Sequence, residues 1–189
     1  MKKITLADAR NLIEKYLQEK NNRLHSRESE VVVRAIAKHL KKDEEQWAIA
    51  GLLHDLDWEQ TSSNFSQHGV RTLEILKEEK YEINEDMAHA ISAHNEEYTK
   101  IKRESDLDYA VAAGESITGL IYAYALMRPE KLIGMKGRSL NKKFKDKRFA
   151  APVSREFISD IEKIGIEKSV FFELAIAAMQ EISSEIDLD

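Results

Sequence analysis

The sequence predicts an all-α protein, a compact bundle of several helices. Hydrophobic residues recur at helical spacing along nearly the whole chain. Only two prolines, Pro129 and Pro152, and seven glycines occur in 189 residues, so few positions would interrupt a helix. The composition is 42% hydrophobic and 33% charged, which is typical of a folded, water-soluble chain. We therefore expect one domain over residues 1–189, with a hydrophobic core of ordinary size.

The helix starts are predicted from capping patterns. Thr5 and Asp8 form a capping-box pair before the first apolar stripe. Asp43, with Gln46 at the reciprocal position, should cap a third helix, and Ser154 should cap a helix that stops at Gly165. The helices are expected over about residues 5–19, 26–40, 43–55, 66–79, 84–94, 106–127, 154–165 and 167–185.

The segments between these helices differ in character. Residues 62–64 are expected to form a loop, and the strongly basic region 129–152 is expected to be less regular. Tyr109 to Met127 holds 19 residues with a single charge, Glu115. A charge at mid-span is costly in lipid, so we interpret this segment as a buried core helix and not as a membrane span.

Charge and cysteine content exclude several classes of function. The net charge of −5 argues against duplex nucleic acid as a partner, because such binding depends on neutralising phosphates. With no cysteine, any metal must be held by nitrogen and oxygen ligands. No export signal is recognisable, so a cytoplasmic location is expected.

Potential metal ligands lie on the apolar faces of several predicted helices: His25, His54, Asp55, His94 and Glu115. Each shares its helical stripe with hydrophobic residues, among them Val32, Trp47, Leu52, Ile91 and Val111. An isolated carboxylate in such a position costs several kcal/mol or more unless it is paired or bound to a metal. The set indicates either one shared metal site or several separately satisfied core histidines and buried ion pairs.

The stretch Leu52-Leu53-His54-Asp55-Leu56-Asp57-Trp58 resembles the HD superfamily of metal-dependent phosphohydrolases. The superfamily pattern has an upstream histidine, a central His-Asp doublet after an apolar helix, further histidines and a downstream acid. In this sequence the pattern falls on His25, His54, Asp55, His68, His94 and Glu115.

The likeness extends over about residues 20–183 and is similar to a subgroup of small HDIG-type proteins from bacteria and archaea. It continues through residues 118–121, 127–129, 143–147 and 149–151. Two positions depart from the pattern. Glu115 stands where the superfamily usually has aspartate, and Leu56 replaces the Ile-Gly of the name-giving motif.

The resemblance implies an HD-domain bundle with a metal-binding core at about residues 20–127, followed by a basic segment and C-terminal helices at 128–189. A first divalent ion would be held by His25, His54, Asp55 and Glu115. His68 and His94 would either hold a second ion, with Asp55 bridging, or contact the substrate phosphate. The ion, one or two in number, would be Mn, Fe, Zn, Ni, Co or Mg.

The expected catalytic set is Asp55, Asp57, His68 and His94. Asp57 is close in sequence to the doublet, and three roles stay open for it: general base, support for a ligand, or surface-loop acid. The expected substrate is a small phosphorylated compound such as a nucleotide.

The basic segment 136–148 is the other feature suited to phosphate. It carries seven lysines and arginines against a single acid, Asp146. It could gather an anionic substrate, with Arg128, Lys143 and Lys145 as the expected binding residues. The alternative is a solvated basic loop.

Other interpretations of the whole chain remain at this stage. They are a non-catalytic module that binds metal or nucleotide, an oxidative enzyme with a di-iron site, and a metal-free helical scaffold with buried ion pairs. No membrane partner is expected, and a homodimer is among the assemblies that the sequence leaves open.

Overall fold

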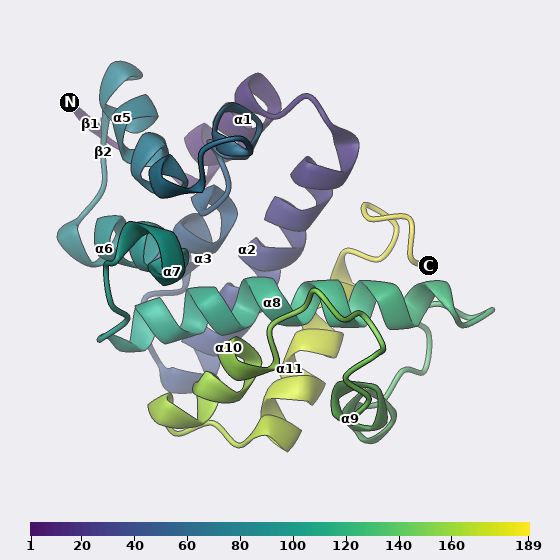
Figure 1. The fold of residues 1–189 in the computed structure, drawn as a ribbon. Coiled ribbons are helices and arrows are strands. Elements are labelled where there is room, and N and C mark those ends of the chain that lie inside the picture. Colours follow the sequence, from purple (N-terminus) through teal and green to yellow (C-terminus); the bar gives the residue numbers. More distant parts are fainter.

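A computed structural model describes residues 1–189, and all its long elements are helices (Figure 1). Three helices form the centre: α2 (Lys20–Leu40), α3 (Glu44–Leu53) and α8 (Asp106–Leu126). Helix α2 packs along both of the others, and α8 crosses in front of it in Figure 1. The all-α prediction is confirmed.

Shorter elements surround this centre. Two two-residue strands, β1 (Lys2–Lys3) and β2 (Tyr81–Glu82), pair in parallel. The other elements are α1 (Leu6–Tyr16), α4 (Trp58–Thr61), η1 (Phe65–Gln67), α5 (Val70–Glu78), α6 (Glu85–Ala93), α7 (Glu96–Thr99), α9 (Gly137–Lys145), α10 (Arg155–Ser159), η2 (Asp160–Ile164) and α11 (Lys168–Glu181). One connected hydrophobic core includes buried residues from Ile4 to Leu188, so both ends of the chain contribute to it.

Two glycines let the central helices approach closely. A Cβ atom on Gly51 of α3 would lie 2.8 Å from the backbone oxygen of Ser29 and 2.9 Å from the Val33 side chain. A Cβ on Gly114 of α8 would lie 2.7 Å from the Val33 Cγ2 atom. Val33 of α2 is thus contacted from both sides. This contact fixes the end of α3 and the middle of α8 relative to α2.

The predicted caps are confirmed. The Thr5 hydroxyl accepts from the Asp8 amide at 3.2 Å in a complete capping box. Asp43 accepts from the Gln46 amide at 3.0 Å, and Ser154 accepts from the Phe157 amide at 3.2 Å.

The basic region 129–152 differs from the expectation because it contains the helix α9. Leu140 is fully buried, and the ring of Phe144, four residues later, lies 5.4 Å from the ring of Phe172 in α11. Two apolar positions on one face are enough to dock a helix whose other positions are mostly basic or polar.

Some boundaries also differ. α2 begins at Lys20 and not near residue 26, because its first turn is held from outside: the side-chain NH₂ group of Asn22 donates to the Glu59 carboxylate at 2.9 Å. The segment from Arg155 to Ile164 changes from α-helix to 3₁₀-helix before Gly165. The strand pair and the short helices α4 and α7 were not expected. No helix, α8 included, combines the length and the apolar character needed to cross a membrane.

Candidate metal centre

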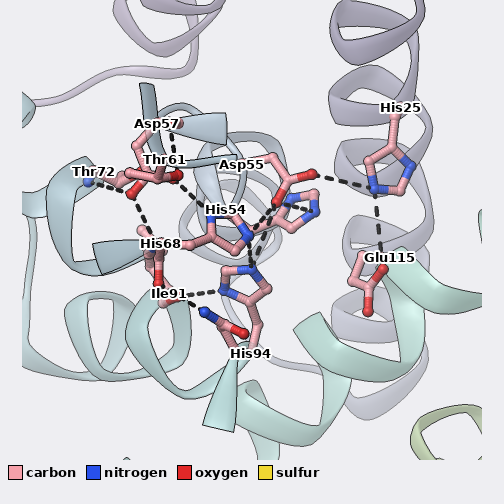
Figure 2. A network of polar contacts seen from close by, with 12 residues as sticks. His25, His54, Asp55, Asp57, Thr61, His68, Thr72, Ile91, His94 and Glu115 are labelled. Atoms are coloured by element: carbon pink, nitrogen blue, oxygen red, sulfur yellow. Dashed lines mark hydrogen bonds and ion pairs between the residues drawn. The ribbon is translucent and has the colours of Figure 1, made fainter. Parts of the chain in front are cut away.

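Asp55 lies at the centre of four imidazole rings (Figure 2). Its Oδ1 atom is 3.1 Å from Nε2 of His68, 3.3 Å from Nε2 of His54 and 3.5 Å from Nε2 of His94. Its Oδ2 atom is 3.7 Å from Nε2 of His25. These side chains come from α2, the end of α3, the turn before α5 and the end of α6. The structure therefore brings together the four histidines and the aspartate that the sequence singled out.

The donor atoms form two overlapping groups that could each hold a metal ion. One group is His25, His54 and Asp55, and the other is Asp55, His68 and His94. Within each group the ligand atoms lie within 4.8 Å of one another. Asp55 belongs to both groups, which is the arrangement expected of a carboxylate that bridges two ions.

Backbone carbonyls orient two of the rings. Nδ1 of His54 donates to the carbonyl of Gly51 at 2.8 Å, and Nδ1 of His94 donates to the carbonyl of Ile91 at 2.5 Å. A carbonyl only accepts, so the proton of each neutral ring is on Nδ1. The lone pair of each Nε2 then faces Asp55, which is the form in which histidine binds metal.

The ring of His25 is oriented through α8. The Thr118 hydroxyl donates to the backbone oxygen of Glu115 at 2.7 Å and lies 3.1 Å from Nδ1 of His25. Because its one proton is already engaged, this hydroxyl accepts the Nδ1 proton of His25. Again Nε2 is left free toward the centre.

Asp57 holds the fourth ring. Its Oδ1 atom is 2.8 Å from Nδ1 of His68, and its Oδ2 atom accepts from the amides of Gly69 and Thr72 at 2.7 and 3.0 Å. Asp57 is fully buried, so the surface-loop role considered for it is wrong. Both its oxygens are engaged away from Asp55, which favours support of His68 over proton transfer.

The protonation of this cluster suits a cation. Burial lowers the pKa of His25 to about 4. Burial opposes ionisation of Asp55, but the surrounding histidines, His54 foremost, outweigh burial and hold the pKa of this carboxyl well below its usual range. At neutral pH Asp55 is thus anionic and His25 neutral, the forms that bind metal.

His54 and His68 behave differently. Burial opposes the charged form of His54, but the charge of Asp55 outweighs burial and raises the pKa of this ring. The same is true of His68. Burial acts to lower its pKa, but hydrogen bonds to Asp55 and Asp57 outweigh burial and raise the pKa to about 9. A proton therefore competes with a cation for this ring. The Nε2 atom of His54 shows that these residues suit a metal ion. It is buried and has no hydrogen-bond partner. A cation between the two groups of donors would give it one.

Glu115 lies at the edge of the centre. Its Oε2 atom is 4.0 Å from Nε2 of His25, and its Oε1 atom accepts from the Ser116 hydroxyl at 2.5 Å. It is not part of either group of donors, although it faces the first group. Burial raises the pKa of Glu115 to about 7. That Glu115 binds the ion stays a prediction.

The three expected substrate-binding residues lie toward the C-terminal end of α8. Arg128 donates to the carbonyl of Ile133 at 2.9 Å, and the Lys143 ammonium lies over the Tyr124 ring. Lys145 lines a cavity between α9 and α11. None of the three lines either of the two cavities that adjoin His25.

Those two cavities contain residues that the sequence reasoning missed. One, of about 350 Å³, is lined by His25, Glu115, Ser116, Gly119, Pro152, Val153, Ser154 and Phe157. The other contains Glu28, which follows His25 by three residues and precedes Val32 by four. That spacing places a charged residue on the inward stripe of α2, so the same helical periodicity could have revealed it.

The fold and the site together describe an all-helical protein with a buried histidine and aspartate cluster suited to a divalent cation. A family model of the HD domain matches residues 24–132, a stretch that begins just before His25 and contains all six predicted ligands. The chain therefore belongs to the HD-domain family, and its resemblance to the metal-dependent phosphohydrolases of that superfamily is confirmed. No curated protein and no solved structure gives a significant match.

Proposed function

We propose that this protein is a phosphohydrolase that cleaves a phosphomonoester or phosphodiester bond in a nucleotide or another small phosphorylated compound. The observation that carries the proposal is the position of Asp55, shared by two groups of metal donors. A divalent cation bound there would acidify a water molecule and polarise a phosphoryl oxygen. Mn, Fe, Zn, Ni, Co and Mg all remain candidates for nitrogen and oxygen ligands of this kind.

The residues of the chain divide the work by position. His25, His54 and Asp55, with Glu115 beside them, would hold one ion, and Asp55, His68 and His94 would hold the second. Asp57 keeps the His68 ring in place from behind.

The cavity of about 350 Å³ beside His25 and Glu115 supports the choice of a small substrate. Its volume is near the lower end of the roughly 300–1,000 Å³ typical of small-molecule sites. Ser154 lines it, and its hydroxyl accepts from the Phe157 amide, so its own proton is free for a hydrogen bond to a phosphoryl oxygen.

The test begins with elemental analysis of protein purified without a metal-binding tag. Phosphate release is then measured over a panel of phosphomonoesters, phosphodiesters and nucleotides, with each candidate divalent ion added in turn. We expect one or two bound ions per chain and turnover of at least one compound. A protein free of metal and inactive with every ion would contradict the proposal.

The second candidate is a non-catalytic module that binds metal or nucleotide. One observation favours it: glutamate at position 115 replaces the usual aspartate and lies outside both groups of donors. The variant Glu115→Asp separates the two. Phosphate release that appears only in this variant would show that the natural chain binds metal or nucleotide without hydrolysing a substrate.

A further inference from the structure

A second cavity lies beside the metal centre, between α2 and α8. Its volume is about 180 Å³, and it is lined by Asn21, Leu24, His25, Glu28, Gly119 and Tyr122. Pockets for drug-sized ligands occupy roughly 300–1,000 Å³, so this space suits one portion of a molecule. Glu28 has no part in the metal centre described above.

Glu28 is buried without a partner. Its side chain lines the cavity, the residue is 3% exposed, and its Oε1 atom has no hydrogen-bond partner. Glu30, two residues later, shows the usual alternative: it is fully buried as well, but Arg10 and Arg27 form ion pairs with it. A buried carboxyl group that forms no hydrogen bond is costly, so Glu28 needs an explanation that Glu30 does not.

The protonation state of Glu28 narrows the chemistry of a ligand. Burial raises the pKa of this carboxyl to about 8, so at neutral pH it is mostly the neutral acid. A neutral carboxyl donates one hydrogen bond and accepts others, which matches a hydroxyl group. A cationic amine would instead require the ionised carboxylate.

The cavity adjoins the proposed active site. His25 and Gly119 line both this space and the cavity that contains Glu115 and Ser116. Glu28 follows His25 by three residues, a rise of about 4.5 Å along the helix. A Cβ on Gly119 would lie 3.2 Å from the Val153 side chain, so the glycine keeps the shared wall free of a side chain.

We propose that this cavity binds a hydroxyl-bearing, sugar-sized portion of the phosphorylated substrate, with Glu28 hydrogen-bonded to a hydroxyl group. The proposal rests on the proposed function, because it assumes that the phosphate of the same molecule lies at the metal centre. Glu28 is then a specificity residue. It selects substrates by the part of the molecule that does not react.

The experiment compares ribose 5-phosphate with tetrahydrofurfuryl phosphate, which has the same ring and phosphate but lacks the ring hydroxyls. The ratio of kcat/KM for the two compounds, and the ratio of their Kd values by calorimetry, are measured with Mn²⁺ for the wild type and for Glu28→Leu. We expect the wild type to prefer ribose 5-phosphate about tenfold or more, and Glu28→Leu to lose most of this preference. Glu28→Gln, which still donates and accepts hydrogen bonds, should keep most of it.

The matched control is Ser29→Ala. Ser29 is the next residue on α2 and its buried hydroxyl also has no hydrogen-bond partner, but it does not line the cavity. Its variant should leave both ratios unchanged. Circular dichroism confirms that each variant is folded, and Glu28→Ala replaces the leucine variant if that one does not fold.

The outcomes separate this inference from the proposed function. Turnover of both compounds with no preference in the wild type, or an equal loss on both in the Glu28 variants, would overturn the sugar subsite and leave the phosphohydrolase intact. If neither compound is hydrolysed, the ratio of the two Kd values alone tests the sugar subsite. A preference in binding that disappears in Glu28→Leu supports the subsite, and an absence of preference overturns it.

Discussion

The metal centre depends on ring orientation. Each of the four histidines has a partner at Nδ1, namely two backbone carbonyls, one hydroxyl and one carboxylate. Such partners fix the tautomer and the direction of a ligand. All four Nε2 atoms consequently face one carboxylate, Asp55.

Asp55→Ala should remove the bound metal, because it deletes the ligand common to the two groups. We expect metal content near zero by elemental analysis and loss of phosphate release by more than about a hundredfold, since residues that merely orient a ligand are worth about 10–100-fold. His89→Ala is the control, because His89 bonds to Asp108 at 3.0 Å outside the centre. Full metal occupancy in Asp55→Ala would show that the ions are held elsewhere.

Asp57→Asn should weaken one group selectively. The asparagine oxygen would accept from the Gly69 and Thr72 amides, and its NH₂ group would then donate to Nδ1 of His68. That reverses the tautomer and places the proton on Nε2, so affinity at the Asp55–His68–His94 group should fall about 10–100-fold. Titration with Mn²⁺ measures this affinity.

Thr72→Val is the control for Asp57→Asn, because it removes a neighbouring buried hydroxyl and leaves the hydrogen bond from the Thr72 amide in place. Equal affinities in the wild type and Asp57→Asn would contradict the positioning role.

Glu28 should make stability depend on pH. Its pKa is about 8 in the fold, against an ordinary value of 4.5. Between these values the folded state keeps a proton that the unfolded state has released, so the contribution of Glu28 to the free energy of unfolding declines as pH rises from about 4.5 to about 8. Relative to Glu28→Gln, the wild type should lose up to about 1.4 kcal/mol per pH unit in this window by urea unfolding. A parallel pH dependence in the two proteins would exclude a raised pKa.

Most residues of this centre could be predicted from the sequence, because helical periodicity indicates which residues face inward. It did not reveal the partners of Nδ1, since Gly51 and Ile91 contribute only backbone oxygens. It also left three roles open for Asp57, because the amides that bind this carboxylate belong to Gly69 and Thr72, twelve and fifteen residues later in the chain. Such contacts depend on the folded backbone and have no local signature.

At the scale of elements, the position of α3 against α2 decides where His54 and Asp55 lie. Gly51 stands one turn before His54, at the point where a side chain would meet the backbone of α2. Separation of the two helices at this point would move both ligands away from His25.

Gly51→Ala should therefore destabilise the protein. In an ordinary helix interior the change from glycine to alanine stabilises by about 1 kcal/mol. Here the added Cβ would lie 2.8 Å from the Ser29 oxygen, and overpacking of this kind costs typically about 1–3 kcal/mol. Urea unfolding measures the change in the free energy of unfolding. Gly119→Ala is the control, because a Cβ at this position would meet only the movable Val153 side chain. A gain in stability for Gly51→Ala would contradict the close approach.

Elements were predictable where capping and periodicity agreed. Thr5, Asp43 and Ser154 marked their helices correctly, whereas α9 was missed because Leu140 and Phe144 are the only large apolar residues of a basic segment. The pairing of β1 with β2 joins residues almost eighty positions apart and rests on two residues in each strand. Sequence patterns of that length do not distinguish a strand from a loop.

At the scale of the molecule, the metal donors come from the N-terminal half of the chain. They lie on α2, after α3, before α5 and after α6, whereas α9, α10 and α11 contribute none. An ion at the centre would link segments that lie far apart along the chain. Metal binding and folding should therefore be coupled.

Removal of the metal should lower the melting temperature. An ion present at about 100 times its Kd stabilises the folded state by about 2.7 kcal/mol, and each kcal/mol shifts the Tm of a protein of this size by about 2–4 °C. We expect EDTA followed by desalting to lower the Tm by about 5–10 °C, and the added ion to restore it. Asp55→Ala should melt at the same temperature with or without EDTA, because it lacks the shared ligand. The contrary result is a wild-type protein that contains metal by elemental analysis and has the same Tm after the metal is removed. The ion would then be bound at a site that does not join these helices, and Asp55 would not be the residue that links the helices.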